Sequence, residues 1–249
     1  MNRFMEISNF LDRYKDFSKQ LERQKVFYYK AKFAGLFSGY ESLRNAIATF
    51  DKKEALQYNI FDILNINTAE VKTHTPFLRN LLDPIGTHGQ AGLFLSSFIQ
   101  NFIPTDKRDF FILPDRHDYH IEEEKLIQNG RIDIYIHSID PKKKFGIIIE
   151  NKLFAGDQYL QLNRYYDFIK GRKYKDLQMI MFYLTIDGND PSTSSIDKKL
   201  MTELKERNIL LNLSYKTDIK NWLQSLIVSI ESNKVKYLIE QYLKTIDYF

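Results

Sequence analysis

The chain has 249 residues, enough for one large domain or for a core with helical additions. Hydrophobic residues make up 43% and charged residues 27%, so both a buried core and a water-facing surface are expected. No cysteine is present, which excludes disulfides and thiolate metal sites. The net charge of +4 is compatible with a polyanionic partner but does not identify one.

No apolar run approaches the roughly 20 residues needed to cross a bilayer. The first residues, MNRFMEISNFLDRYK, contain no apolar stretch followed by a small-residue cleavage site, so no secretory signal is expected. Together with the lack of cysteine, these features predict a cytoplasmic protein that does not act on a membrane.

Residues 1–57 are predicted to form an N-terminal helical extension. They contain no proline, and apolar residues recur close to helical spacing from Ile7 to Leu21. The prediction is one long helix, or two helices broken near Gly35 and Gly39. Three roles stay open for this extension: packing on the core, contact in a dimer, or covering a groove of DNA.

A group of short helices is expected next. The apolar spacing over Leu56–Leu64 indicates an amphipathic helix. Thr75 followed by Pro76 predicts the start of a helix, and Asp83–Pro84 predicts its end. Another helix is predicted over residues 93–102.

The middle of the chain is predicted to form a mixed sheet. Residues 115–136 indicate two strands joined by a turn at Gln128–Gly130, where Asn-Gly is a strong hairpin signal. A third strand should end at Glu150, and strands and helices alternate after it, so an α/β fold is expected. The later elements are a helix after Gly156–Asp157, strands over 178–185 and 209–213, and helices around Trp222 and over 237–246.

Three charged residues lie in or next to apolar runs: Asp133 is inside IDIYI, and Glu150 and Lys152 follow FGIII. Acids inside apolar strands lose hydration and need a compensating partner, for which a metal ion is a common solution. Side chains two apart on a strand share a face, so Glu150 and Lys152 point the same way. Two carboxylates on neighbouring strands beside an ammonium group predict a site for a hard divalent cation.

This pattern resembles the D…(D/E)xK signature of the PD-(D/E)XK nuclease superfamily. Gln161 and Tyr165 resemble the QxxxY element of its RecB-like branch. Residues 70–89, with EVKTH, FLRNLLDP and GTHG, are similar to the opening of one uncharacterised subfamily. The resemblance covers roughly residues 58–185, and Ile132 stands where the name-giving motif has proline.

The resemblance implies a restriction-endonuclease-like core and a Mg²⁺-dependent nuclease, with Mn²⁺ as a substitute. It implies a metal held by Asp133, Glu150 and the carbonyl of Asn151, and it makes Glu70 a candidate third acid; a loop glutamate at the surface is the alternative. Lys152 would orient the attacking water or stabilise developing charge. The expected catalytic set is Asp133, Glu150, Lys152, Gln161 and Tyr165.

Nucleic acid is the expected partner, with DNA as the expected form. Basic clusters after the second strand and near the QxxxY helix either neutralise phosphates or are solvated turns and helix ends. The run Glu122–Glu124 either offers an acid to the metal or forms a solvated edge, and His120 and His137 have no assigned role. The predicted nucleic-acid contacts are Lys142, Lys143, Lys144, Gln158, Arg164 and His74. For His74 a purely structural role is the alternative.

The expected division is a helical extension over 1–57, a nuclease core over 58–190, and an α/β completion of the same domain over 191–249. Cutting of double strands by this fold commonly uses two sites, which makes a homodimer a further expectation. Two rival readings stay open: a nuclease-like module that binds nucleic acid or protein without cutting, and a purely structural ion pair of Lys152 with Glu150 or Asp133.

Overall fold

The chain divides into two compact units. The structure is a computed structural model that describes residues 2–55 and 57–249. One unit extends to Tyr58, and the other is Asn59–Phe249. Each is described by itself below.

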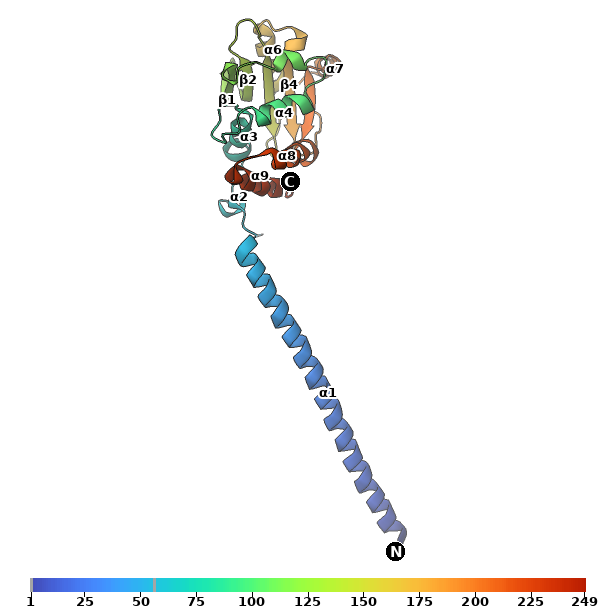
Figure 1. The fold of residues 1–249 in the computed structure, drawn as a ribbon. Coiled ribbons are helices and arrows are strands. Elements are labelled where there is room, and N and C mark those ends of the chain that lie inside the picture. The colour runs from blue at the N-terminus through green and yellow to red at the C-terminus, as the bar shows by residue number, and fades with distance from the viewer. Residues whose placement is uncertain (1, 56) are drawn as a thin grey trace. The chain divides into compact units, whose positions relative to one another are not determined.

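The first unit is one continuous helix, α1 (Asn2–Glu54), with no break at Gly35 or Gly39 (Figure 1). Every side chain from Glu6 to Ala55 is exposed. Large apolar side chains recur along it at alternating intervals of three and four, and each of these is more than half exposed. This spacing is the heptad pattern of a coiled-coil seam. We call the set the α1 seam: Val26, Tyr29, Phe33, Leu36, Tyr40, Leu43, Ile47 and Phe50.

The second unit contains a five-stranded sheet in the order β1-β2-β3-β4-β5. The first three strands are antiparallel, and β3, β4 and β5 are parallel. The sheet is therefore mixed, as predicted. The strands are β1 (Tyr119–Ile127), β2 (Gly130–Ser138), β3 (Gly146–Lys152), β4 (Met179–Thr185) and β5 (Leu210–Ser214).

Short helices connect and cover these strands. Before the sheet come α2 (Ile60–Ile63), the π-helical turn η1 (Glu70–His74), α3 (Thr75–Leu82), α4 (Leu93–Phe102), α5 (Arg108–Phe111) and the 3-10 turn η2 (Arg116–Asp118). Within and after it come α6 (Gln161–Gly171), η3 (Asp176–Gln178), α7 (Lys198–Glu206), η4 (Tyr215–Ile219), α8 (Lys220–Leu226), η5 (Ile227–Ser229) and α9 (Asn233–Ile246).

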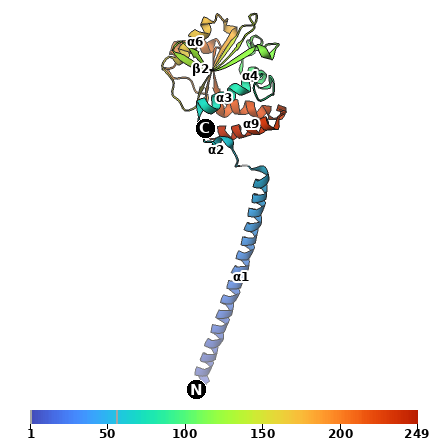
Figure 2. The same cartoon turned by 90° about the vertical axis from the view of Figure 1, so that its left-hand side faces the viewer.

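Two apolar clusters hold the sheet between helical layers. The larger joins one face of the strands to α3, α4, α8 and α9. The smaller joins the opposite face to α6 and α7. Figure 2 shows α6 on one side of β2 and α4 on the other. The strand β3 is buried along its whole length, because helices cover both of its faces.

Several helix boundaries agree with the sequence predictions, and two helices differ from them. Pro76 lies in the first turn of α3, Asp83 ends that helix, and α4 has the predicted bounds. The helix after β3 begins later than expected, at Gln161, because Leu160 adopts a left-handed conformation with φ of 50°. The predicted helix over Leu56–Leu64 is reduced to α2, and Leu56 lies outside the described residues.

Among the described residues, no helix combines the length and the apolar character that a membrane span requires.

Candidate active site at the ends of β2 and β3

Asp133 and Glu150 lie on neighbouring strands at one end of the sheet. The antiparallel register of β2 and β3 pairs Ile134 with Ile149. One step further along this register sets Asp133 opposite Glu150. The backbone amide of Asn151 donates to Oδ2 of Asp133 at 2.7 Å, which ties this carboxylate to the strand that carries Glu150.

The carboxylate of Glu150 is fully buried and is met by three side chains. Nζ of Lys152 lies 2.8 Å from its Oε1. Nε2 of Gln161 donates to the same oxygen at 2.7 Å, and the Tyr165 hydroxyl donates to Oε2 at 2.8 Å. That hydroxyl also contacts the carbonyl of Arg131 on β2. The predicted Gln161 and Tyr165 therefore converge on the predicted acid, from successive turns of α6.

Lys152 remains an ammonium group in this setting. Burial lowers its pKa, but attraction to Glu150, and then to Asp133 and Glu70, outweighs that effect and leaves the pKa above the usual value. The side chain is almost buried, so its contact with Glu150 is poorly screened by water.

The surroundings of Asp133 and Glu150 disfavour the ionised forms of both carboxyl groups. Burial, followed by repulsion from Glu150, raises the pKa of Asp133 to about 8, against smaller opposing effects of the Asn151 amide and Lys152. Burial also raises the pKa of Glu150. A divalent cation bound between the two carboxylates would favour their ionised forms. Because every candidate ligand atom is oxygen, the set fits Mg²⁺ chemically.

Glu70 reaches the same end of the sheet from η1. Its Oε2 accepts hydrogen bonds from the amides of Leu153 at 2.7 Å and Phe154 at 3.3 Å, directly after β3. Its charge also raises the pKa of Glu150. Glu70 is thus near the acidic pair and is fixed there by the backbone.

The side chain of Asn151 belongs to a buried hydrogen-bond chain. Its Nδ2 donates to Oγ1 of Thr75 at 3.0 Å, and its Oδ1 accepts from the Tyr215 hydroxyl at 2.9 Å. These contacts join β3 to α3 and to η4. Because the amide group is occupied in this way, the backbone carbonyl is the atom of Asn151 that stays available as a predicted ligand.

The expected phosphate contact of His74 is incompatible with its position. His74 is fully buried, with Nδ1 2.9 Å from the Tyr242 hydroxyl and Nε2 3.0 Å from the carbonyl of Asn67. Burial lowers its pKa, which disfavours the imidazolium that would attract phosphate. His74 is a core residue that fixes the turn before α3.

The three lysines predicted to bind nucleic acid lie at the wrong end of the hairpin for this site. Lys142, Lys143 and Lys144 are exposed in the loop between β2 and β3. Glu150 follows Lys144 by six positions, which is roughly 20 Å along a strand. They can neutralise phosphate there, but they do not line the carboxylate site.

Gln158 and Arg164 interact with each other near the start of α6. Nη2 of Arg164 lies 3.4 Å from Oε1 of Gln158, and its Nη1 donates to the carbonyl of Tyr159. The Arg164 Nε lies over Gly130 at the β1–β2 turn and has no hydrogen-bond partner. Gln158 precedes α6, so it lies outside the helix that carries Gln161 and Tyr165.

Two residues near the acids had no predicted role. Tyr183 on β4 is the parallel partner of Glu150. Its hydroxyl donates to Oδ1 of Asp157 at 2.8 Å, and the other oxygen of Asp157 accepts from the Ser192 amide at 2.8 Å. Through these two hydrogen bonds, Asp157 joins the loop after β3 to β4 and to the loop after β4. A tyrosine in an otherwise apolar strand, MIMFYL, was the signal that could have indicated it.

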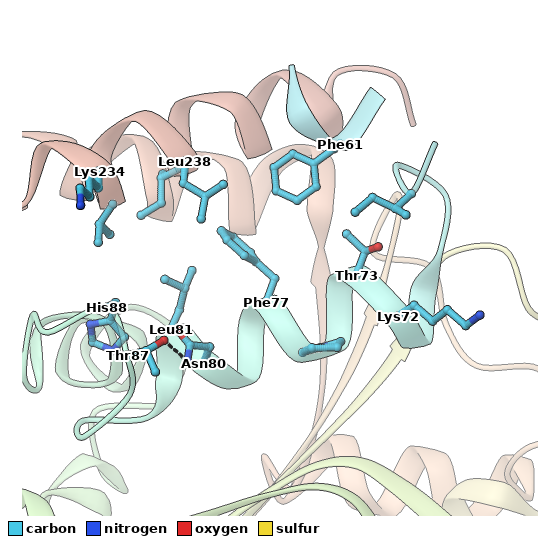
Figure 3. A pocket seen from close by; sticks show the side chains of 14 residues that line it. Phe61, Lys72, Thr73, Phe77, Asn80, Leu81, Thr87, His88, Lys234 and Leu238 are labelled. Carbon is cyan, nitrogen blue, oxygen red and sulfur yellow. Dashed lines mark hydrogen bonds between the residues drawn. The ribbon is translucent and has the colours of Figure 1, made fainter. Parts of the chain in front are cut away.

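A hollow lies apart from the carboxylates. It lies between α3 and α9, has a volume of about 440 Å³, and is lined largely by apolar side chains such as Phe61, Phe77, Leu81 and Leu238. Figure 3 shows Phe77 and Leu81 on α3 directed toward Leu238 on α9. Neither Asp133 nor Glu150 lines this hollow.

A five-stranded mixed sheet with helices on both faces is the restriction-endonuclease-like α/β fold, and here it carries an aspartate, a glutamate and a lysine at one end. A family model described as the PD-(D/E)XK nuclease superfamily matches residues 58–244. The chain belongs to this superfamily. Neither curated proteins nor solved structures give a match to the chain.

Proposed function

We propose that this protein is a Mg²⁺-dependent nuclease that hydrolyses phosphodiester bonds of DNA at Asp133, Glu150 and Lys152. The observation that carries the proposal is the convergence of these groups at one end of the sheet. Nζ of Lys152 lies 2.8 Å from Glu150. The carboxylate of Asp133 accepts a hydrogen bond from the amide of Asn151, which lies between these two residues on β3.

In this proposal Asp133 and Glu150 hold the metal ion, with the carbonyl of Asn151 and with Glu70 as a third acid. Mg²⁺ requires only one or two carboxylates and keeps several waters, which suits this small set; Mn²⁺ can take its place. When bound, such an ion polarises a phosphoryl group and lowers the pKa of a coordinated water.

The remaining residues act on charge and position. Lys152 brings an ammonium group to the acids, where it orients the attacking water or stabilises the negative charge that develops on the phosphate. Gln161 and Tyr165 hold the carboxylate of Glu150 in one orientation. Arg164 and Gln158, near the β1–β2 turn, and Lys142–Lys144, at the far end of the hairpin, are the proposed contacts to the DNA backbone.

A homodimer is part of the proposal. The α1 seam exposes eight large apolar side chains at heptad spacing, and a single helix gives them nothing to pack against. A second copy of the same helix offers a matching seam. Two chains would also bring two active sites to one DNA duplex.

The alternative is a nuclease-like module that binds nucleic acid or protein without cutting. The complete set of Asp133, Glu150 and Lys152 disfavours it, because a binding module has no need of all three groups. Retention of DNA in Mg²⁺ with no cleavage of any substrate is the result that would support this alternative.

The deciding experiment incubates the purified chain with supercoiled, linear duplex and circular single-stranded DNA, and with single-stranded RNA, in Mg²⁺ or EDTA. We expect Mg²⁺-dependent cleavage of DNA. Asp133→Asn and Lys152→Ala should each lower the rate by at least about 100-fold, since charge stabilisation is usually the largest catalytic effect. Glu206→Gln and Lys199→Ala, on the exposed surface of α7, are the matched controls. Cleavage by Asp133→Asn or Lys152→Ala at the control rate would refute the mechanism.

A further inference from the structure

A second group of possible metal ligands lies on the β1–β2 hairpin. His120 and Glu122 are two apart on β1, so they share a face, and His137 on β2 is the cross-strand partner of His120. One ligand atom from each of the three side chains lies within 4.8 Å of the other two. Oε1 of Glu122 lies 3.3 Å from Nε2 of His137.

The ligand types differ from those of the carboxylate site. Two imidazoles and one carboxylate are a ligand set of zinc, which binds each at about 2.0–2.2 Å and takes three protein ligands with a fourth position open. Ligand atoms around a tetrahedral zinc ion are roughly 3.4 Å apart. The Glu122–His137 separation already has this value, so small side-chain rotations bring all three groups to an ion.

Other contacts orient two of the three ligands. Nδ1 of His137 lies 3.3 Å from the Ser138 carbonyl, so its Nε2 is the nitrogen directed toward Glu122. Its ring stacks on Tyr135 with centroids 4.8 Å apart. Oε2 of Glu122 accepts from Lys125 at 2.7 Å, which leaves Oε1 for the ion. Metal-bound histidines commonly have their second nitrogen held by a carbonyl in this way.

The group is also accessible and distinct. His120 is exposed, and Glu122 and His137 are half-buried, so an ion can enter from solvent. His137 follows Asp133 by four positions on β2, which is roughly 13 Å along the strand.

We propose that His120, Glu122 and His137 form a zinc-binding site that clamps the edge strand β1 to β2. The site takes a borderline divalent cation, with water in the fourth position, and it discriminates against Mg²⁺, which prefers oxygen ligands in an octahedron. It is independent of the nuclease proposal, because it shares no residue with the carboxylate site.

The test uses the full chain carrying Asp133→Asn and Glu150→Gln, so that metal cannot bind at those acids. After treatment with EDTA and dialysis, ZnCl₂ is titrated by calorimetry, and bound zinc is counted by elemental analysis. We expect one zinc per chain, a rise in melting temperature, and no saturable heat with MgCl₂. X-ray absorption should give nitrogen and oxygen ligands near the zinc distances quoted above.

His120→Ala and His137→Ala, each added to this background, should weaken zinc binding by more than about 100-fold, the upper end of what losing an outer-shell partner costs. His117→Ala, at an exposed position of η2, is the control and should bind like the parent. Because His120 is exposed, its replacement preserves the fold and keeps the test decisive. Absence of saturable zinc binding, or equal binding by His120→Ala and His117→Ala, would overturn the proposal.

In the otherwise unchanged chain, His120→Ala should cleave DNA in Mg²⁺ at the parental rate. The zinc site and the nuclease site therefore fail or succeed separately.

Discussion

A fully buried glutamate is stable only where protein groups replace the water that it loses. Around Glu150 this is done by Lys152, Gln161 and Tyr165, which together engage both carboxylate oxygens. A buried ion pair by itself contributes little to stability, because the cost of desolvation offsets the attraction. The network is therefore better explained as a device that fixes the orientation of one carboxylate than as a source of stability.

Tyr165→Phe tests this role of the network. The change removes the hydroxyl that bonds Oε2 of Glu150 and leaves that oxygen buried. We expect a loss of about 1–3 kcal/mol in the free energy of unfolding, from the unsatisfied acceptor. We also expect metal affinity or activity to fall by about 10–100-fold, as for other residues that position a ligand.

Urea denaturation and metal titration measure the two effects. Tyr166→Phe is the matched control, because it removes a hydroxyl from the neighbouring residue, where the contact is a 3.3 Å bond from Arg207. Equal losses of metal affinity in the two variants would contradict a positioning role for Tyr165.

The raised pKa of Asp133 predicts how stability depends on pH in the absence of metal. Its folded pKa is about 8, against an ordinary value of 3.8, so the folded state binds this proton more tightly than the unfolded state does. The free energy of unfolding should therefore fall as pH rises between these values, by as much as about 1.4 kcal/mol per pH unit from this group.

Urea denaturation in EDTA from pH 5 to 8.5 measures this slope. In Asp133→Asn the decline should be smaller, and the variant should be more stable than the parent at pH 8. Saturating Mg²⁺ should reverse the decline in the parent, because the ion binds the ionised carboxylates. A parent and a variant with the same pH profile would show that Asp133 carries no unfavourable charge.

Some positions of the candidate functional residues can be predicted from the local sequence pattern, and others cannot. Asp133, Glu150 and Lys152 are predictable, because strand alternation and hairpin pairing determine which residues become neighbours. For His74 the structural alternative holds rather than the phosphate contact, and sequence could not decide between them because a histidine before a helix looks the same whether it is buried or exposed. The hairpin places Lys142–Lys144 far from the acids. A cluster of lysines in the sequence does not by itself predict that distance.

At the scale of elements, α1 is the clearest case of an apolar pattern that finds no partner within its own unit. Most of the stability of a helix in a protein comes from packing of its apolar face rather than from the propensity of its residues. Gly35 and Gly39 each cost about 1 kcal/mol in a helix interior. The α1 seam therefore has to be covered for the helix to persist, and a parallel or antiparallel copy of α1 covers it most directly.

Leu43→Asp should separate the proposed dimer into monomers, because it places a charge in the middle of the α1 seam. Light scattering after size exclusion should give a mass near twice the chain for the parent and near one chain for the variant. Ser38→Asp adds the same charge outside the seam and should leave the dimer intact. A monomeric parent, or equal behaviour of the two variants, would contradict the coiled coil.

The sequence pattern predicts one element boundary, the β1–β2 turn, and fails to predict another, the start of α6. The hairpin from β1 to β2 was predicted from Asn-Gly, and the turn in fact leaves Ile127 paired with Gly130. This register places His120 opposite His137, so these two proposed zinc ligands could have been paired from the position of the turn. The start of α6 could not be found, because the left-handed residue before it is Leu160, where glycine or asparagine would have been the usual signal.

At the scale of the whole molecule, the sheet and the extension have separate tasks. The family match covers residues 58–244, and the unit Asn59–Phe249 holds every proposed catalytic residue. The helix α1 holds none of them. The extension would therefore govern how many active sites act together on one DNA molecule, while the second unit governs the chemistry at each site.

This division predicts the products from supercoiled DNA. A dimer with two sites should cut both strands in one encounter and convert supercoiled circles directly to the linear form. Leu43→Asp should retain hydrolysis, because Asp133, Glu150 and Lys152 are untouched, but should yield nicked circles first. A gel time course at low enzyme concentration distinguishes the two routes, with Ser38→Asp as the control. Direct linearisation by a monomeric Leu43→Asp variant would show that one chain cuts both strands, and nicked circles from the dimeric parent would show that the dimer does not pair its sites on one duplex.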